Sequence, residues 1–283
     1  MSNTSFSSLN LPDALISNLN DLGYSSMTAI QAQALPPILN GQDVIAQAKT
    51  GSGKTAAFGL GLLAKLDVKY FRVQALVLCP TRELADQVAA ELRKLARSIH
   101  NIKILTLCGG VPIGPQIGSL EHGAHIIVGT PGRVIDHLDK GRLSLADLTT
   151  LVLDEADRML EMGFTADLDA VIAKAPTARQ TLLFSATYPT AIAKLSERLL
   201  KDPVQVTVAE QHNTSSIQQQ FFQVSHAQGP SEVSARTKPA TRQPIRPPTF
   251  RPVFPIYPAQ RQRLSYDLRC RAAQILSPAR HNT

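Results

Sequence analysis

The sequence predicts an α/β fold, with a mostly parallel sheet covered by helices on both faces. Short, continuously apolar segments alternate along the chain with longer segments whose apolar residues recur every three to four positions. Strands that are apolar on both sides belong to sheets buried between two layers of helices. The polar clusters of the chain directly follow the apolar segments. Because ligands of such sheets bind at the carboxyl ends of the strands, we expect one shared active edge.

The same patterns place the individual elements. Helices are expected over 11–22, 29–39, 56–66, 82–98, 133–140, 165–175 and 190–200. Strands are expected over 44–46, 75–79, 103–107, 125–129, 151–153, 181–184 and 204–208. Thr28 is the expected N-cap of the second helix, and Asn40-Gly41 its left-handed end. We expect a helical region over 1–42 that belongs to the first domain, an α/β domain over 43–225, and a separate tail over 226–283.

The tail differs from the rest of the chain in charge and in proline content. The net charge is +7, but residues 1–225 hold 19 Lys and Arg against 20 Asp and Glu, while residues 226–283 hold 10 against 2. Nine of the 19 prolines also lie in the tail. Because proline is excluded from helix interiors and central strands, we predict a disordered tail. The overall basicity is therefore no argument for a nucleic-acid surface on the domain.

Other features of the composition exclude several classes of protein. The three cysteines, Cys79, Cys108 and Cys270, are far apart and form no CxxC pair, so we expect reduced thiols rather than disulfides or a zinc site. No apolar run approaches the roughly 18 residues of a membrane span. The N-terminus lacks a basic segment followed by an apolar one, so no secretory signal is expected. These features predict a cytoplasmic protein without a membrane partner.

The segment from Ala48 to Thr55 predicts a phosphate-binding loop between a strand and a helix. Its glycines let the backbone turn successive N–H groups toward a phosphate, and the helix N-terminus adds positive charge. Lys54 would reach the terminal phosphates, and Thr55 would bind Mg²⁺. The alternative is a simple turn, although a Lys-Thr pair after the second glycine has no turn-forming purpose. The predicted phosphate ligands are Ala48, Thr50, Gly51, Ser52, Gly53, Lys54 and Thr55.

A second candidate site is the acidic run Asp154-Glu155-Ala156-Asp157, which follows an apolar strand. Carboxylates at a strand end that faces a phosphate loop can hold Mg²⁺ and activate water. We expect Asp154 to bind the metal and Glu155 to orient the attacking water, with Lys54 completing the catalytic set. The alternative is an ordinary acidic helix N-terminus, where carboxylates are stabilised by the helix dipole.

Asp154-Glu155-Ala156-Asp157 is also the signature of the DEAD-box ATP-dependent RNA helicases, and the chain resembles this family in further segments in the family's order. Phe6, Tyr24 and Gln31 resemble the motif that recognises adenine, with Met27 where many members have proline. The amide of Gln31 can both donate to and accept from the edge of the base. Ser185-Ala186-Thr187 resembles the motif that couples hydrolysis to strand separation, which adds Ser185 and Thr187 to the catalytic candidates.

Three segments resemble those with which the family grips the RNA backbone. They follow the second, third and fourth expected strands, and they combine helix N-termini, glycine amides and arginines that suit phosphates. His100, His122, His125 and His137 are predicted to be surface or packing residues. The RNA-binding candidates are Pro80, Thr81, Arg82, Gly110, Thr130, Pro131, Gly132 and Arg133.

The resemblance implies a RecA-like P-loop domain that binds ATP and Mg²⁺ and acts on RNA. It is strongest to bacterial members that act in assembly of the large ribosomal subunit, so ribosomal RNA is an expected partner, and a monomer is assumed. The arginine-bearing motifs of the family's second domain are not found after Val224. We therefore expect weak ATP binding, poor hydrolysis and no unwinding. The alternatives are a non-catalytic ATP- and RNA-binding fragment, and a phosphate-loop ATPase acting on DNA or protein. The tail is either an out-of-frame end or a genuine RNA-binding extension.

Overall fold

The computed structural model describes residues 4–208, and the statements below concern this part of the chain. The tail predicted over 226–283, and the last residues of the domain predicted over 43–225, lie outside the described residues. No described helix combines the length and the apolar character that crossing a bilayer requires.

The described residues form one sheet of seven parallel strands in the order β3-β4-β2-β5-β6-β1-β7. This confirms the predicted α/β fold with a parallel sheet. The strands β5, β6 and β1 are neighbours in this order. The acidic run follows β5, the Ser185-Ala186-Thr187 segment begins at the end of β6 and the phosphate loop follows β1, so these three segments lie side by side. The strands are β1 Val44–Gln47, β2 Ala75–Leu78, β3 Ile104–Leu107, β4 Ile126–Gly129, β5 Thr150–Leu153, β6 Gln180–Ser185 and β7 Val204–Thr207.

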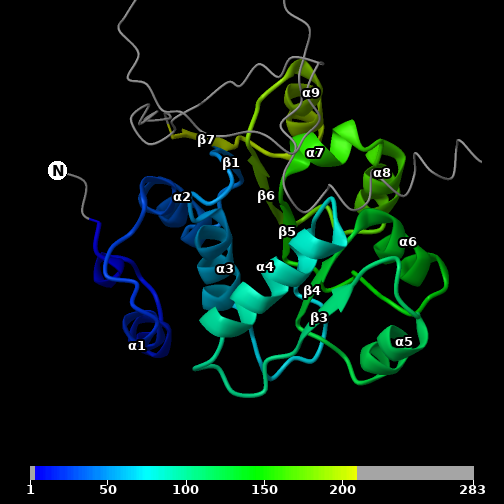
Figure 1. Cartoon of the computed structure of the whole chain (residues 1–283), viewed down its shortest axis with the longest axis horizontal. Helices are drawn as coiled ribbons and strands as arrows, with labels where there is room; N and C mark the ends of the chain where they lie inside the picture. The colour runs from blue at the N-terminus through cyan, green and yellow to red at the C-terminus, as the bar shows by residue number, and fades with distance from the viewer. Residues whose placement is uncertain (1–3, 209–283) are drawn as a thin grey trace, which may run out of the picture. The chain divides into compact units, whose positions relative to one another are not determined.

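Helices cover both faces of the sheet, with α2, α3 and α4 on one side and α6 to α9 on the other (Figure 1). A 3₁₀ helix over Phe6–Ser8 and α1 pack with the first group. The helices are α1 Asp13–Asp21, α2 Ala29–Leu39, α3 Lys54–Lys65, α4 Arg82–Leu95, α5 Gly114–Glu121, α6 Pro131–Asp139, α7 Ala156–Glu161, α8 Thr165–Ala173 and α9 Thr190–Leu199.

The core is divided by the sheet into two clusters, because successive strand residues point to opposite faces. On β1, Val44 and Ala46 pack with α2, α3 and α4, whereas Ile45 packs on the opposite face with residues of α9 such as Ile192 and Leu195. All of these side chains are buried. This two-sided burial is the physical reason for the continuously apolar strands.

The structure differs from the sequence prediction at several helix boundaries. The helices α5 and α7 were not predicted; α7 has only six residues, and α5 carries glycines and a proline that weaken its helical pattern. Helix α3 begins two residues before the expected position because Gly53, at φ +95°, turns the chain directly into Lys54. Helix α4 ends at Leu95, where the Asn18 amide of α1 donates to the Lys94 and Leu95 carbonyls at 3.0 and 2.8 Å.

The approach of α3 to α2 depends on a glycine. A Cβ atom built on Gly61 would lie 2.2 Å from Cγ2 of Ile38, which is fully buried. Gly61→Ala is therefore expected to lower the free energy of unfolding by about 1–3 kcal/mol, because a side chain is forced into a packed core. This expected loss is the net value after the roughly 1 kcal/mol that alanine gains over glycine in a helix. Urea denaturation followed by circular dichroism measures the change.

Gly118→Ala in α5 is the matched control, because a Cβ there meets nothing within 4 Å. We expect this variant to be as stable as the wild type or more stable. Equal effects of the two substitutions would contradict the proposed packing of α3 on α2.

Candidate functional site

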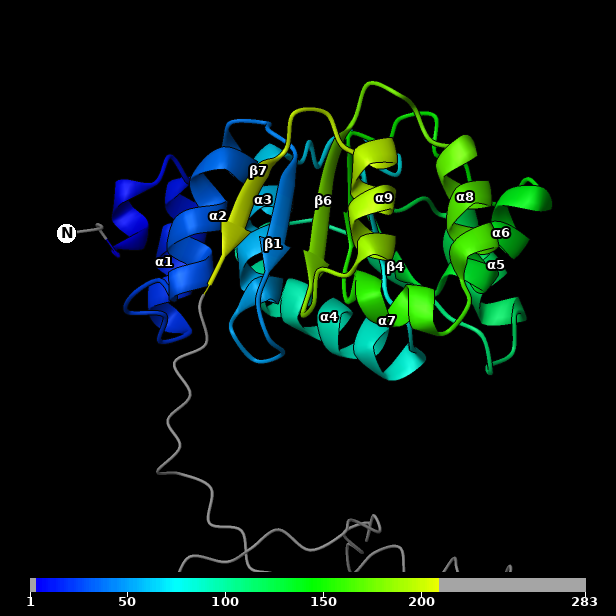
Figure 2. The same cartoon turned by 90° about the horizontal axis from the view of Figure 1, so that it is seen from above.

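Apart from Phe6, Tyr24 and Gln31, which precede β1, the predicted site residues lie at one edge of the sheet, because every strand is parallel and each polar segment follows a strand. The arrowheads of β1, β6 and β7 end on the same side of the domain (Figure 2). Backbone hydrogen bonds fix the neighbouring loops to one another. The Ala48 N–H donates to the Ser185 carbonyl at 3.0 Å, and the Asp154 N–H donates to the Leu78 carbonyl at 2.9 Å. The shared edge expected from the sequence is present.

The phosphate loop needs its two glycines. Gly51 and Gly53 have φ angles of +81° and +95°, in the left-handed region that side chains rarely adopt. A Cβ atom on Gly53 would also lie 2.6 Å from Nε2 of Gln31. The loop therefore tolerates no side chain at position 53, and its backbone packs directly against Gln31.

The side chain of Lys54 is buried without a partner. Only 6% of the residue is exposed, and its Nζ has no hydrogen-bond acceptor among the described residues. The Oγ of Ser52 in the same loop is also buried and unpartnered. A buried charge normally has a partner, since removing it from water is costly. The donors left free in this loop fit the phosphate groups of a nucleotide.

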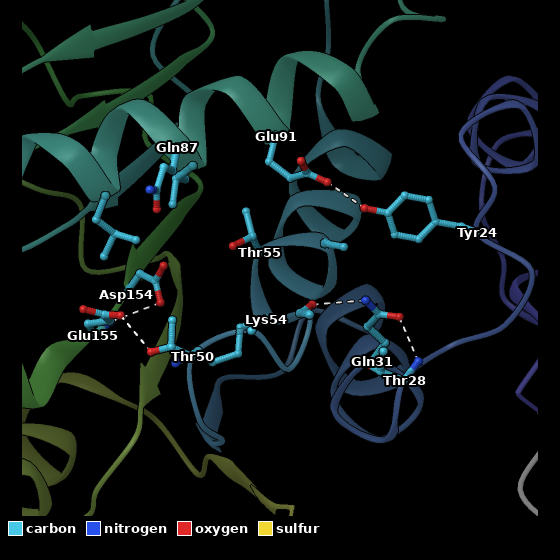
Figure 3. A pocket seen from close by; sticks show the side chains of 15 residues that line it. Tyr24, Thr28, Gln31, Thr50, Lys54, Thr55, Gln87, Glu91, Asp154 and Glu155 are labelled. Carbon is cyan, nitrogen blue, oxygen red and sulfur yellow. Dashed lines mark hydrogen bonds between the residues drawn. The ribbon is translucent and has the colours of Figure 1, made fainter. Parts of the chain in front are cut away.

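A pocket of about 480 Å³ opens beside this loop, between α2, the start of α3, α4 and the Asp154-Glu155 turn (Figure 3). Most of the predicted ATP and metal ligands line it, but Phe6, Ala48 and Ser52 do not. The predicted residues in its wall are Tyr24, Gln31, Thr50, Gly51, Gly53, Lys54, Thr55, Asp154 and Glu155.

Sequence reasoning missed the part of the wall that α4 provides. The pocket is also lined by Leu84, Gln87, Val88 and Glu91 of this helix. These positions recur at three to four residues and therefore share one helix face. The spacing was visible in the sequence, but nothing in it showed that this face turns toward the phosphate loop. Thr28 is a further lining residue that the sequence identified only as a helix cap.

Gln31 links the pocket to the phosphate loop. Its Nε2 donates to the Gly53 carbonyl at 3.1 Å, and its Oε1 accepts from the Thr28 N–H at 2.9 Å. The amide has two N–H groups and an oxygen with two lone pairs, so one donor and one acceptor site remain. That capacity fits the edge of adenine, which offers one acceptor and one donor.

The surroundings of Asp154 disfavour ionisation of its carboxyl group. The residue is 3% exposed, and burial raises the pKa of its carboxyl to about 6, although the Lys54 ammonium acts to lower it. Its Oδ1 accepts from the Glu155 N–H at 3.1 Å. Within residues 4–208, no group of three or more His, Cys, Asp and Glu side chains lies together as a metal cage. Asp154 and Thr55 instead fit Mg²⁺ held by one carboxylate, a hydroxyl and nucleotide phosphates.

Glu155 occupies a strained backbone conformation at the end of β5. Its φ and ψ angles are 51° and 52°, a left-handed conformation that costs energy for a residue with a side chain. The Thr50 hydroxyl donates to its Oε1 at 3.1 Å, and Arg158 lies 3.6 Å from its Oε2. Strain of this kind persists when the surrounding structure requires it, and it directs the Glu155 carboxylate toward the phosphate loop.

Asp157 connects the acidic run to the segment after β6. Its Oδ2 accepts from both the N–H and the hydroxyl of Thr187, at 2.9 and 2.8 Å. Burial by itself raises the pKa of Asp157, but these hydrogen bonds outweigh it and hold the pKa below its ordinary value. Ser185, the other catalytic candidate of this segment, is buried at the end of β6. Thr187 is thus tied to the same turn that carries Asp154 and Glu155.

The RNA candidates lie at the carboxyl ends of β2, β3 and β4. Thr81 caps α4 by accepting from the Leu84 N–H at 3.2 Å. Thr130 precedes α6, whose first residue is Pro131. The guanidinium of Arg82 is exposed, 4.0 Å from an oxygen of Asp86. Two helix N-termini and an exposed arginine at one edge are suited to phosphate groups.

Arg133 is held by a buried glutamine that the sequence did not identify. Its guanidinium donates to the Val111 carbonyl at 3.3 Å and to Oε1 of Gln116 at 3.2 Å. Gln116 of α5 also donates to the Cys108 carbonyl at 3.0 Å and lies 3.1 Å from Nε2 of His137. Gln116 therefore joins the segments after β3 and β4. His137 is fully buried, as expected of a packing residue.

Comparison with known proteins identifies the group to which these features belong. Residues 28–195 match the DEAD/DEAH box helicase family. The chain is 62% identical over 223 residues to "ATP-dependent RNA helicase DbpA" of Escherichia coli, covering 78% of this chain and 49% of that protein. It is 43% identical over 233 residues to "ATP-dependent RNA helicase CshA" of Listeria monocytogenes, covering 82% and 45%.

A solved structure gives the same result for the fold. The crystal structure of a DEAD box protein from the hyperthermophile Methanococcus jannaschii superposes with a TM-score of 0.70 and 39% sequence identity, covering 73% of this chain and 56% of that one. The present chain thus spans about half the length of these curated relatives.

The raised pKa of Asp154 predicts that this residue destabilises the ligand-free fold at neutral pH. Because the pKa of Asp154 is about 6 in the folded state and about 3.9 in the unfolded chain, stability falls as the pH rises from about 4 to about 6 and stays low above that. Asp154→Asn cannot ionise, so it is expected to be more stable than the wild type at pH 7.5 by about 3 kcal/mol. Thermal unfolding without nucleotide or Mg²⁺ measures this as a rise of about 5–10 °C.

The advantage of the variant should fall to about half at pH 5, because the wild type regains stability as the pH drops from about 6 toward the pKa of about 3.9 of an unfolded aspartate. Asp21→Asn, at an exposed position of α1, is the control and should leave the melting temperature within about 1 °C at both pH values. A lower melting temperature for Asp154→Asn at pH 7.5 would show that the buried carboxylate is stabilising and that the argument is wrong.

Proposed function

We propose, from the premise that this chain belongs to the DEAD/DEAH box helicase family, that its pocket binds ATP with Mg²⁺ and that it acts as the nucleotide-hydrolysing part of an RNA helicase. The observation that carries the proposal is the buried, unpartnered ammonium of Lys54 beside the buried carboxyl of Asp154. Lys54 attracts the Asp154 carboxylate without a hydrogen bond to it, and a phosphate together with a divalent ion would give both groups partners.

The residues divide the binding of ATP among themselves. The loop amides, Lys54 and Ser52 hold the phosphates, and Gln31 holds the adenine through its remaining donor and acceptor. Thr55 and Asp154 would hold Mg²⁺, which would neutralise the negative charge of the phosphate oxygens. Tyr24 contributes an aromatic wall beside Gln31.

Hydrolysis depends on residues that follow β5 and β6. Glu155 orients the attacking water, and the hydrogen bond from Thr50 holds its carboxylate toward the phosphates. Asp157 transmits the position of this turn to Thr187, and Ser185 lies at the same strand end. Through these contacts, the state of the nucleotide is expected to reach the segment proposed for strand separation.

RNA is the proposed macromolecular partner. Thr81, Thr130 and Arg82 would contact the phosphate backbone without reading bases. Gln116 holds Arg133 and the backbone at Cys108, just after β3, in place. Similarity to ATP-dependent RNA helicases supports RNA as the substrate. The motif resemblance adds ribosomal RNA, a part in large-subunit assembly and a cytoplasmic location to the proposal. A monomer is the simplest state for this arrangement.

Turnover by this chain is proposed to be slow. None of the described residues that line the pocket is an arginine. In related phosphate-loop enzymes, an arginine that reaches the transferred phosphate is worth about 10³–10⁵ in rate. This observation favours, as a second candidate function, a domain that binds ATP and RNA without efficient hydrolysis or unwinding.

The rate of ATP hydrolysis with and without RNA tests the proposal. For the wild type we expect slow turnover that RNA increases, and for Glu155→Gln a rate lower by at least about 100-fold with ATP binding retained, since the water is no longer oriented. Glu197→Gln, an exposed residue of α9, is the control and should hydrolyse ATP at the wild-type rate.

ATP and RNA binding without turnover in the wild type would support the non-catalytic candidate. Absence of ATP binding would refute both candidate functions. Efficient unwinding of a short RNA duplex by the pure chain would show that the proposed impairment is wrong.

A further inference from the structure

Two residues from distant parts of the chain meet at the rim of the pocket. The hydroxyl of Tyr24, in the turn between α1 and α2, donates to Oε1 of Glu91 at 2.6 Å (Figure 3). Glu91 lies in the third turn of α4, on the face of that helix that lines the pocket. The contact therefore spans the pocket wall and joins two elements that are 67 residues apart in sequence.

The ring of Tyr24 also packs against a second aromatic residue. Phe6, which is 4% exposed, packs edge-on against it, with ring centroids 6.2 Å apart and an interplanar angle of 78°. Burial, together with the carboxylate of Glu91, raises the pKa of Tyr24 to about 12. The phenol therefore remains protonated at neutral pH and keeps donating. The contact with Phe6 and the hydrogen bond of the hydroxyl together restrict the orientation of the ring.

The second oxygen of Glu91 has a weaker partner. Lys94, one turn further along α4, lies 3.2 Å from Oε2, but its own side chain is 63% exposed. An ion pair between exposed groups contributes little, whereas a charged acceptor that receives a short O–H bond is a strong contact. Tyr24 is thus the principal partner of the Glu91 carboxylate.

We propose that Glu91 is a positioning residue of the nucleotide site, which fixes the Tyr24 ring as a ready-made wall for the adenine base. The inference rests on the proposed ATP-binding function and assigns α4 a part in it. A planar base binds more tightly to an aromatic ring whose orientation is already fixed, because the tyrosine side chain loses no rotamer freedom on binding. The carboxylate of Glu91 is bonded to Tyr24 and Lys94 and not to the phosphate loop or Asp154, so its effect is expected on binding of the base alone.

Calorimetric binding of ATP and of inorganic tripolyphosphate, both with Mg²⁺, tests the proposal. Glu91→Met keeps the length of the side chain but removes the acceptor, and we expect its affinity for ATP to fall about tenfold. Its affinity for tripolyphosphate, which uses only the phosphate loop, should stay within twofold of the wild type. Tyr24→Phe keeps the ring but removes the donor, and it should show the same pair of results.

The double variant shows whether the two residues act through each other. If Glu91 acts through the Tyr24 hydroxyl, Glu91→Met should cost no further affinity for ATP in a Tyr24→Phe background. Lys94→Met and Glu197→Met are the matched controls, and both should bind the two ligands as the wild type does.

Three outcomes would overturn the proposal. If the wild type binds ATP and Glu91→Met binds it equally tightly, the role proposed for Glu91 is wrong while the proposed ATP-binding function stands. Equal losses for ATP and tripolyphosphate would indicate a general effect on the fold and would also overturn it. Failure of the wild type to bind ATP would remove the proposed function together with this inference. If Glu91→Met does not fold, Tyr24→Phe decides between the same outcomes.

Discussion

The arrangement of the domain depends on two buried groups of opposite charge, Lys54 and Asp154, which attract each other but share no hydrogen bond. Lys54 has no hydrogen-bond acceptor within the described residues, and Asp154 is buried so far from water that its pKa rises to about 6. Lys54 begins the helix that follows β1, Asp154 directly follows β5, and only β6 lies between these two strands. Both groups are costly in the empty protein, and a phosphate with a divalent cation would satisfy them together.

The surrounding structure serves to keep these groups in place. Gly53 brings the phosphate loop into contact with Gln31, and the strained backbone of Glu155 turns its carboxylate toward Thr50. Asp157 extends the same network to Thr187. The buried charges and the strained backbone at this edge of the sheet destabilise the fold, and the two packed layers on either side of the sheet compensate for them. Such a division is common at functional sites.

Much of the fold could be predicted from the sequence because parallel strands buried on both faces leave a strong apolar pattern. What could not be predicted depends on contacts between distant segments. The end of α4 is set by Asn18, which a local pattern does not reveal. The short helices α5 and α7 have weak periodicity of their own. The phosphate loop and the acidic run are local motifs, so the sequence alone reveals them. The roles of Glu91 and Gln116 depend on partners 67 and 17 to 21 residues away, so no local pattern reveals them.

The affinity of Lys54→Met for ATP with Mg²⁺, measured by calorimetry beside the wild type, tests the central claim most directly. If the buried ammonium is held for the nucleotide phosphates, its removal should weaken binding by at least about 100-fold, since a buried charge pair is broken. The methionine fills the same space, so the fold should survive. Binding within about threefold of the wild type would show that Lys54 does not hold the phosphates and would contradict the account.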